Sequence, residues 1–291
     1  MNTKTILLND NKQYRKFTGV DLFHKEGYFG KRVSVASGEI WSLNIYNPNN
    51  QCYNPKHFLP ITEYDHAINT AATFFQVAPE AKLYPVYSTN GRYGKQYDSK
   101  FFDYSADIID EYKITLMFTS LLSMRHNEWY NDLSNWMNEH PSFKWFWSAG
   151  NDDNFYNPII EIDQMFGVSA YTISTTNTIY PYKINYASEL IDIIYSAPTM
   201  TYTNIKALKK SDIGYVNSGT SFSAPWLCGM MALVDDFFID NTGHSLSRNA
   251  MKQFMNDNAV TISKSNIDTA IKMVYLPKPS SIDIDKYKNI K

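Results

Sequence analysis

The 291-residue sequence contains few cysteines, little net charge and no long apolar run. Its two cysteines, Cys52 and Cys228, are too few for a disulfide framework, and we expect Cys228 to be a buried thiol in an apolar helix. The formal net charge of −2 gives no reason to expect a nucleic-acid partner or an anionic membrane surface. No segment approaches about 18 consecutive apolar residues, so the sequence predicts no membrane partner.

The N-terminal residues lack the apolar core of a secretory signal peptide, because only Ile6, Leu7 and Leu8 stand together before Asn9. We therefore expect a cytoplasmic location, or a place in a particle assembled there. The composition is ordinary for a globular protein, with 44% hydrophobic and 19% charged residues. We predict one domain over residues 1–276 and a loose polar tail over 277–291. No feature indicates an oligomeric state.

The most informative segment is residues 214–234, which places small polar residues ahead of a long apolar stretch. Its centre reads Gly219-Thr-Ser-Phe-Ser-Ala-Pro225, and we predict that a buried helix begins there. Ser221 would lie in the first turn, where unpaired N–H groups and the helix dipole stabilise an oxyanion. Pro225 suits a first turn, where its missing N–H is not needed. The alternative is a serine that only caps a core helix.

The pattern Gly-Thr-Ser-x-Ser-x-Pro resembles the nucleophile segment of subtilisin-like serine proteases. Two further segments resemble that family in the same order: residues 77–83, after the expected histidine helix, and Ala149-Gly-Asn151, which resembles the oxyanion segment. The resemblance spans about Gly27 to Val234. It implies a three-layer α/β fold with a mostly parallel twisted sheet, helices on both faces and the site at the carboxyl ends of the strands.

The family resemblance assigns a role to each candidate catalytic residue. Ser221 would be the nucleophile, His66 the general base and Asn151 the donor to the oxyanion. Asp65 is a poor partner for His66, since adjacent residues on a helix point apart. Taken alone, a histidine is more often structural, and an asparagine after glycine is an ordinary turn residue. The catalytic roles are favoured here because the matching segments occur in the family order. The short segment before Tyr28 leads us to expect no folding pro-domain, as in intracellular or phage-borne members.

The candidate acid is the first of three departures from the family pattern. The catalytic aspartate should stand at the end of the first core strand, and an ungapped count from the turn at residues 28–31 puts Glu39 there. A glutamate can orient an imidazole, although its extra methylene demands a changed backbone position. A gapped alignment puts Ala36 at that place, and the triad would then lack its carboxylate. Glu39 would then be a solvated residue at a strand end.

The other two departures bear on the substrate. Ala67 replaces the glycine that follows the family's histidine, and is either tolerated or crowds the site. Leu122 and Ser123 replace two glycines after a predicted strand, where side chains would narrow or fill the pocket for the residue before the cut. By resemblance, the substrate-binding residues are Ser120, Leu121, Leu122, Ser148, Ala149, Gly150 and Thr220.

The sequence predicts neither a metal ion nor a cofactor. The family's usual calcium-binding loop has no counterpart, since only Phe74-Phe75-Gln76 lie at its place and a Ca²⁺ site needs several oxygen ligands. We therefore predict a serine endopeptidase that hydrolyses a peptide or protein substrate through Ser221, His66 and Glu39. Two alternatives stay open. The three departures favour a pseudoprotease that serves as a binding or scaffolding module, and the same triad could instead catalyse peptide ligation or ester hydrolysis.

Overall fold

The computed structural model describes residues 11–39, 66–86, 106–121, 127–151, 157–173, 178–182, 193–199, 201–203, 215–264 and 270–291. These residues form a nine-stranded sheet and a separate two-stranded sheet. The large sheet has the strand order β10-β11-β7-β5-β4-β3-β1-β2, and β6 pairs with β5. Its neighbouring strands are parallel except for the pairs β10–β11 and β5–β6.

The strands of the large sheet are short, and most of their described side chains are buried. Their bounds are β1 Ser34–Ser37, β2 Lys82–Pro85, β3 Leu116–Thr119, β4 Lys144–Ser148, β5 Phe166–Ile173, β6 Ile179–Tyr182, β7 Ile193–Pro198, β10 Ala259–Lys264 and β11 Ala270–Val274. The separate antiparallel pair consists of β8 (Thr201–Thr203) and β9 (Tyr215–Asn217).

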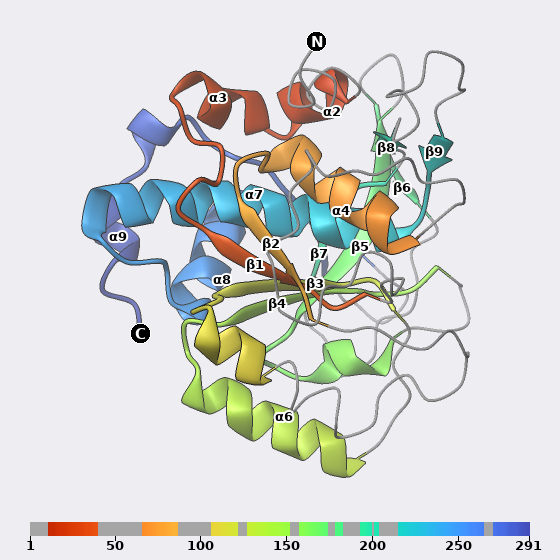
Figure 1. The fold of residues 1–291 in the computed structure, drawn as a ribbon. Coiled ribbons are helices and arrows are strands. Elements are labelled where there is room, and N and C mark those ends of the chain that lie inside the picture. The colour runs from red at the N-terminus through yellow and green to blue at the C-terminus, as the bar shows by residue number, and fades with distance from the viewer. Residues whose placement is uncertain are drawn as a thin grey trace.

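Helices cover both faces of the sheet, as Figure 1 shows for α4 and α7 on one side and α6 on the other. Successive strand residues point to opposite faces, so Val35 of β1 joins the apolar cluster around α7 while Ala36 joins the cluster that contains residues of α6. The predicted three-layer α/β arrangement is confirmed. The helices are α2 Lys12–Phe17, α3 Val20–Lys25, α4 His66–Val77, α6 Asn127–Glu139, α7 Thr220–Thr242, α8 Arg248–Asp257 and α9 Ile284–Tyr287, with short 3-10 helices η2 Pro158–Glu161 and η4 Pro279–Ser281.

Helix α7 forms the centre of the core, with every residue from 222 to 238 buried. Its length and mean hydropathy of 1.3 would suit a membrane-spanning helix, but 94% of that window is buried inside the protein, as in a core helix. Gly229 lets α4 approach closely, because a Cβ there would lie 2.8 Å from the Cβ of Val77. Cys228 is a free, buried thiol, and burial raises its pKa well above the ordinary value. Pro225 lies beyond the predicted first turn, since the helix already begins at Thr220.

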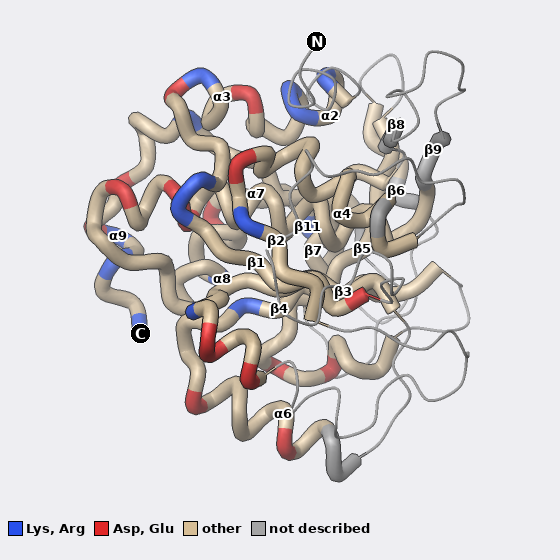
Figure 2. The backbone as a smooth tube through the Cα atoms, viewed as in Figure 1, with Lys and Arg blue, Asp and Glu red and all other residues tan. Residues whose placement is uncertain are grey.

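Charged residues are concentrated away from the sheet (Figure 2). Lys, Arg, Asp and Glu occur on α2, α3, α6, α8 and α9 and at the turn before β1, whereas α4 contains none. In α7 the charges are confined to the second half, at Asp235, Asp236 and Asp240. The first turns of α4 and α7 therefore contain no Lys, Arg, Asp or Glu of their own.

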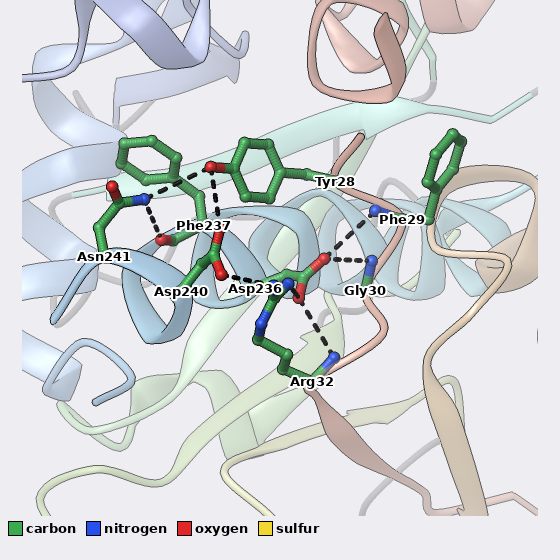
Figure 3. Close-up of polar contacts among 8 residues, drawn as sticks. All are labelled: Tyr28, Phe29, Gly30, Arg32, Asp236, Phe237, Asp240 and Asn241. Carbon is green, nitrogen blue, oxygen red and sulfur yellow. Dashed lines mark hydrogen bonds and ion pairs between the residues drawn. The ribbon is translucent and has the colours of Figure 1, made fainter. Parts of the chain in front are cut away.

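The turn before β1 is bound to the second half of α7 (Figure 3). Asp236 accepts hydrogen bonds from the backbone N–H groups of Phe29 (3.2 Å), Gly30 (3.0 Å) and Arg32 (3.2 Å). The guanidinium of Arg32 binds the same carboxylate at 2.9 Å and also pairs with Asp240. We call Phe29, Gly30, Arg32, Asp236 and Asp240 the turn–helix cluster. It joins the segment that leads into β1 to the helix that begins at Thr220.

The last fifteen positions of the chain do not form the loose tail that their polar composition suggested. Tyr287 is only 5% exposed, and its ring lies 5.4 Å from that of Phe254 and 6.2 Å from that of Phe238. The hydroxyl of Ser247 donates to the carbonyl of Ile290 (2.7 Å). The expectation failed because a few apolar side chains suffice to dock this segment on the core: Ile282, Ile284, Tyr287 and Ile290.

Candidate active site

The segments that follow neighbouring parallel strands meet at the carboxyl edge of the sheet. Glu39 follows β1, Ser120 follows β3 and Asn151 follows β4. Ser221 is the second residue of α7, and His66 is the first residue of α4. Parallel strands bring their carboxyl ends to one edge, which is where sites in open α/β sheets form.

Glu39 and His66 are in direct contact. The carboxylate oxygen Oε2 lies 3.0 Å from the imidazole Nδ1, with Glu39 fully buried and the His66 side chain 35% exposed. An ionised carboxylate can only accept a hydrogen bond, so in this pair Nδ1 carries the proton. The neutral imidazole then keeps its lone pair on Nε2, as a general base requires.

The second oxygen of the Glu39 carboxylate is also hydrogen-bonded. The N–H of Ser120 donates to Oε1 at 2.7 Å. Gly38 donates its N–H to the carbonyl of Phe118 (2.9 Å), which keeps the chain beside β3 beyond the end of β1. Ala36, the alternative position for the acid, is buried within β1 in the cluster on the α6 side. The structure therefore brings Glu39 to the imidazole.

Ser221 lies beside Ser120, the residue whose N–H binds Glu39. The Ser221 hydroxyl donates to the carbonyl of Ser120 (3.3 Å), and the Ser120 hydroxyl donates to the carbonyl of Ser221 (2.8 Å). The next residue, Phe222, places its ring 5.8 Å from the imidazole of His66. Ser221, His66 and Glu39 are thus gathered at one place.

The chain that precedes Ser221 is held by residues that the sequence analysis did not identify. The N–H of Gly219 donates to Oγ1 of Thr199 (2.5 Å), whose hydroxyl donates to the Gly219 carbonyl (2.7 Å). The hydroxyl of Ser223 donates to the carbonyls of Ala197 (3.0 Å) and Pro198 (3.1 Å) at the end of β7. The signal for Thr199 was its position directly after that strand.

The amide of Asn151 is oriented by Thr220. Its Oδ1 accepts hydrogen bonds from the N–H (2.7 Å) and the hydroxyl (3.1 Å) of Thr220, which also bonds the carbonyl of Gly150 (2.9 Å). A backbone N–H requires an oxygen acceptor, so Oδ1 faces Thr220 and the Nδ2 donors face away. Gly219 has φ of 115°, which strains any residue with a Cβ, and a Cβ there would also press on the Asn151 amide at 3.0 Å from Oδ1.

The predicted substrate-binding residues occupy two segments, 120–122 and 148–150, and the single position Thr220. Leu121 and Gly150 are half-buried, and the others described are buried: Ser120, Ser148, Ala149 and Thr220. Leu122 lies outside the described residues. The carbonyl of Leu121 accepts hydrogen bonds from Trp147 (2.7 Å) and from Nδ2 of Asn157 (2.8 Å), which also donates to the carbonyl of Ser148 (3.2 Å). Asn157, a lone polar residue after a turn, carried no signal in the sequence.

Two further observations concern the predicted departures and metal binding. Ala67 is fully buried in the apolar cluster around α7, so its methyl group contributes to the core. In the part of the chain that the structure describes, no three His, Cys, Asp or Glu side chains are grouped so that they could hold a metal ion.

Comparisons with known proteins identify the family and the fold. The model of the subtilase family matches residues 45–275, a range that contains His66, Asn151 and Ser221 but begins after Glu39. The prenylagaramide maturation protease PagA is similar with a TM-score of 0.60 and 15% identity, over 84% of this chain and 89% of that one. A lanthipeptide protease is similar with a TM-score of 0.62 and 17% identity, over 90% and 92%. No curated protein matches the sequence. The fold is subtilisin-like.

Proposed function

Because this chain belongs to the subtilase family of serine proteases, we propose that it is an active endopeptidase whose catalytic groups are Ser221, His66, Glu39 and Asn151. The observation that carries the proposal is the 3.0 Å contact between Oε2 of Glu39 and Nδ1 of His66. It supplies a carboxylate for the imidazole although the family's aspartate is missing.

The reaction begins with attack by Oγ of Ser221 on the scissile carbonyl carbon, while Nε2 of His66 takes the hydroxyl proton. Glu39 holds the imidazole in the required tautomer and stabilises the imidazolium that forms. His66 then gives the proton to the leaving amine as the C–N bond breaks. Water, activated by the same imidazole, attacks the acyl-enzyme and releases the second product.

The oxyanion of each tetrahedral intermediate is bound by Nδ2 of Asn151 and the N–H of Ser221. Thr220 supports this role, because it occupies Oδ1 of Asn151 and turns the Nδ2 donors outward. Donors that are oriented before the reaction need no reorganisation when the negative charge develops. The start of α7 adds its dipole to the same charge.

The free protein keeps the Ser221 hydroxyl on the carbonyl of Ser120 (3.3 Å). Rotation about χ1 of Ser221 would transfer the hydroxyl to Nε2 of His66. Catalytic hydrogen bonds are often long or misaligned without substrate and tighten in the complex, so this arrangement is compatible with an active enzyme.

The substrate is a peptide or protein that lies along the segments after β3 and β4. The Leu121 carbonyl is already occupied by Trp147 and Asn157, so it faces into the protein. Among the described residues, the carbonyl of Ser120 accepts the hydroxyl of Ser221, and a substrate N–H can replace that donor. Ser148, Ala149 and Gly150 would form the opposite wall of the pocket.

A peptide library incubated with the protein and analysed by mass spectrometry tests the proposal. The wild type should cleave a subset of the peptides, and Ser221→Ala should cleave none. Ser280→Ala, which changes an exposed serine remote from the site, should behave as the wild type. Cleavage by Ser221→Ala would exclude the assigned nucleophile. Absence of cleavage by the folded wild type would favour the pseudoprotease.

A further inference from the structure

We infer that the hydroxyl of Ser120 is a positioning group for the nucleophile, because it holds the backbone of Ser221 at the start of α7. The inference rests on the proposed function and adds to it, since the family resemblance assigned Ser120 only to the wall of the substrate pocket. Three observations support it: a missing helical hydrogen bond, the contacts of Ser120 itself and the other anchors of the same turn.

The missing hydrogen bond results from Pro225. In an α-helix, the carbonyl of residue 221 accepts a hydrogen bond from the N–H of residue 225. Proline has no N–H, so the helix cannot supply that donor to Ser221. Both residues belong to α7, and the Ser120 hydroxyl lies 2.8 Å from the Ser221 carbonyl. Ser120 thus replaces the donor that the proline removes.

Ser120 uses each of its polar groups on a member of the proposed triad. Its N–H donates to Oε1 of Glu39 (2.7 Å), its hydroxyl donates to the carbonyl of Ser221 (2.8 Å), and its own carbonyl accepts the Ser221 hydroxyl (3.3 Å). Ser120 is 7% exposed and directly follows β3, a strand whose four residues are all buried. A rigid strand end therefore connects the acid to the nucleophile.

The remaining anchors of the nucleophile turn come from the ends of β4 and β7, and at β4 Thr220 binds Gly150 and Asn151. Thr199 binds Gly219, and Ser223 binds the last carbonyls of β7. Removal of the Ser120 hydroxyl would take away the donor to the Ser221 carbonyl and weaken the contact of the turn with the end of β3, while the contacts with β4 and β7 remain. A displacement of about 1 Å at a reacting group can cost about 10²-fold in rate.

The backbone contacts of Ser120 survive substitution, so the hydroxyl can be tested separately. In Ser120→Ala the N–H still binds Glu39, whereas the donor to Ser221 is lost. Ser120→Thr keeps a hydroxyl and serves as the rescue variant. Thr18→Val is the matched control, because it removes a buried hydroxyl that donates to a carbonyl (Tyr14, 2.8 Å) in α2.

The measurement is the second-order rate of labelling by a fluorophosphonate probe, mapped to Ser221 and followed from pH 5 to pH 9. We expect Ser120→Ala to be labelled about 10²-fold more slowly than the wild type, with the same midpoint of the pH profile. We expect Ser120→Thr to recover at least tenfold, and Thr18→Val to match the wild type. With a peptide cleaved by the wild type, the loss in Ser120→Ala should appear in kcat rather than in KM.

Several results would overturn the inference and leave the proposed function intact. The first is labelling of folded Ser120→Ala at the wild-type rate. The second is a loss of peptide cleavage that appears only in KM, which would assign Ser120 to substrate binding alone. The third is a Ser120→Thr variant that unfolds at the normal temperature but does not recover the labelling rate. A shifted pH midpoint in Ser120→Ala would also overturn it, because the effect would then act through His66 and Glu39. Absence of wild-type labelling would overturn the proposed function itself, and this inference with it.

Discussion

The carboxylate of Glu39 lies 3.0 Å from Nδ1 of His66, although these residues are separated by 27 positions and the acid is longer than the family's aspartate. β1 ends at Ser37, and the hydrogen bond from the N–H of Gly38 to the carbonyl of Phe118 keeps the next residues beside β3. The longer side chain lets one oxygen reach the imidazole while the other binds the N–H of Ser120 (2.7 Å). The substitution therefore preserves the contact on which a catalytic triad depends.

The amide of Asn151 should contribute to the rate and not to substrate affinity. We expect Asn151→Ala to lower kcat by about 10²–10³-fold with little change in KM, because an oxyanion donor acts on charge that exists only in the transition state. Steady-state kinetics on a peptide cleaved by the wild type provide the measurement. Asn249→Ala, which changes another exposed asparagine, is the control. A loss seen in KM alone would contradict the assigned role.

The buried pair Lys144–Asp235 should stabilise the fold only while both partners are present. The ammonium lies 2.8 Å from the carboxylate and both side chains are fully buried. Burial lowers the pKa of Lys144 and raises that of Asp235, and their mutual attraction opposes both shifts. We expect Lys144→Met to reduce the free energy of unfolding by about 3–5 kcal/mol, because it leaves an unpaired buried carboxylate.

A second variant separates the ion pair from simple packing. The double variant Lys144→Met/Asp235→Leu should recover most of the lost stability in denaturant unfolding, since well-packed apolar side chains can replace a buried pair. The carbonyl of Leu246 loses its Lys144 donor in both variants, so that cost cancels, whereas the N–H of Leu246 loses its Asp235 acceptor (3.1 Å) in the double variant alone and makes the recovery incomplete. A double variant that is as unstable as the single one would refute this interpretation.

The turn–helix cluster should depend mainly on Asp236. Asp236→Ala would remove the acceptor of three backbone N–H groups at once, each of which costs about 1–3 kcal/mol when it is buried without a partner. We expect a fall of several degrees or more in Tm. Asp240→Ala removes the exposed pair with Arg32 and a long, exposed hydrogen bond from the Tyr28 hydroxyl (3.4 Å), and it should change Tm far less. Equal losses in the two variants would contradict the importance given to Asp236.

The docked C-terminal segment should show a pH dependence through Asp257. Its carboxylate pairs with Lys286 (2.8 Å) and accepts the hydroxyl of Tyr287 (2.8 Å). Burial alone would raise the pKa of Asp257, but hydrogen bonds from Lys286, Tyr287 and Gln253 outweigh it and lower the pKa. A lowered folded-state pKa means that the stabilisation is present above about pH 4 and is lost as the pH falls through that lowered value.

The comparison of wild type with Asp257→Asn measures this effect. We expect the difference in Tm between them to be larger at pH 6 than at pH 2.5, because the wild type loses its advantage when Asp257 is protonated. Asp132→Asn, which changes an exposed carboxylate in α6, is the control. A difference in Tm that is independent of pH would show that the charge of Asp257 does not hold α9.

The sequence was informative where a pattern is local. The segment 219–225 predicted the start of a buried helix, and the resemblance of segments 77–83, 149–151 and 219–225 to the subtilisin-like family implied the three-layer fold. These features depend on neighbours within a few residues of one another. Cys228 was predicted to be buried for the same reason, since it stands in an unbroken apolar stretch.

The sequence was uninformative where a contact joins distant segments. Ser120 and Ser221 are 101 positions apart, and the hydrogen bond between them depends on how α7 lies against the end of β3. The hydrogen bonds of Thr199 and Asn157 likewise join segments that are distant in the sequence. The sequence did not fix the first residue of the helix, so Pro225 was predicted to lie in the first turn, where its missing N–H has no consequence. Because the helix begins at Thr220, Pro225 lies beyond that turn and leaves the Ser221 carbonyl without its helical donor.

The most direct test of this account is labelling of Ser221 by a fluorophosphonate probe in the wild type and in Glu39→Gln, measured by intact mass and peptide mapping. Glutamine preserves the size of the side chain but can present an N–H to Nδ1, which favours the wrong imidazole tautomer, and such a change costs about 10⁴ in rate in a triad. The account predicts labelling of the wild type at Ser221 and a loss of about 10³–10⁴-fold in the variant. Labelling of folded Glu39→Gln at the wild-type rate would contradict the assignment of Glu39 as the acid of the triad.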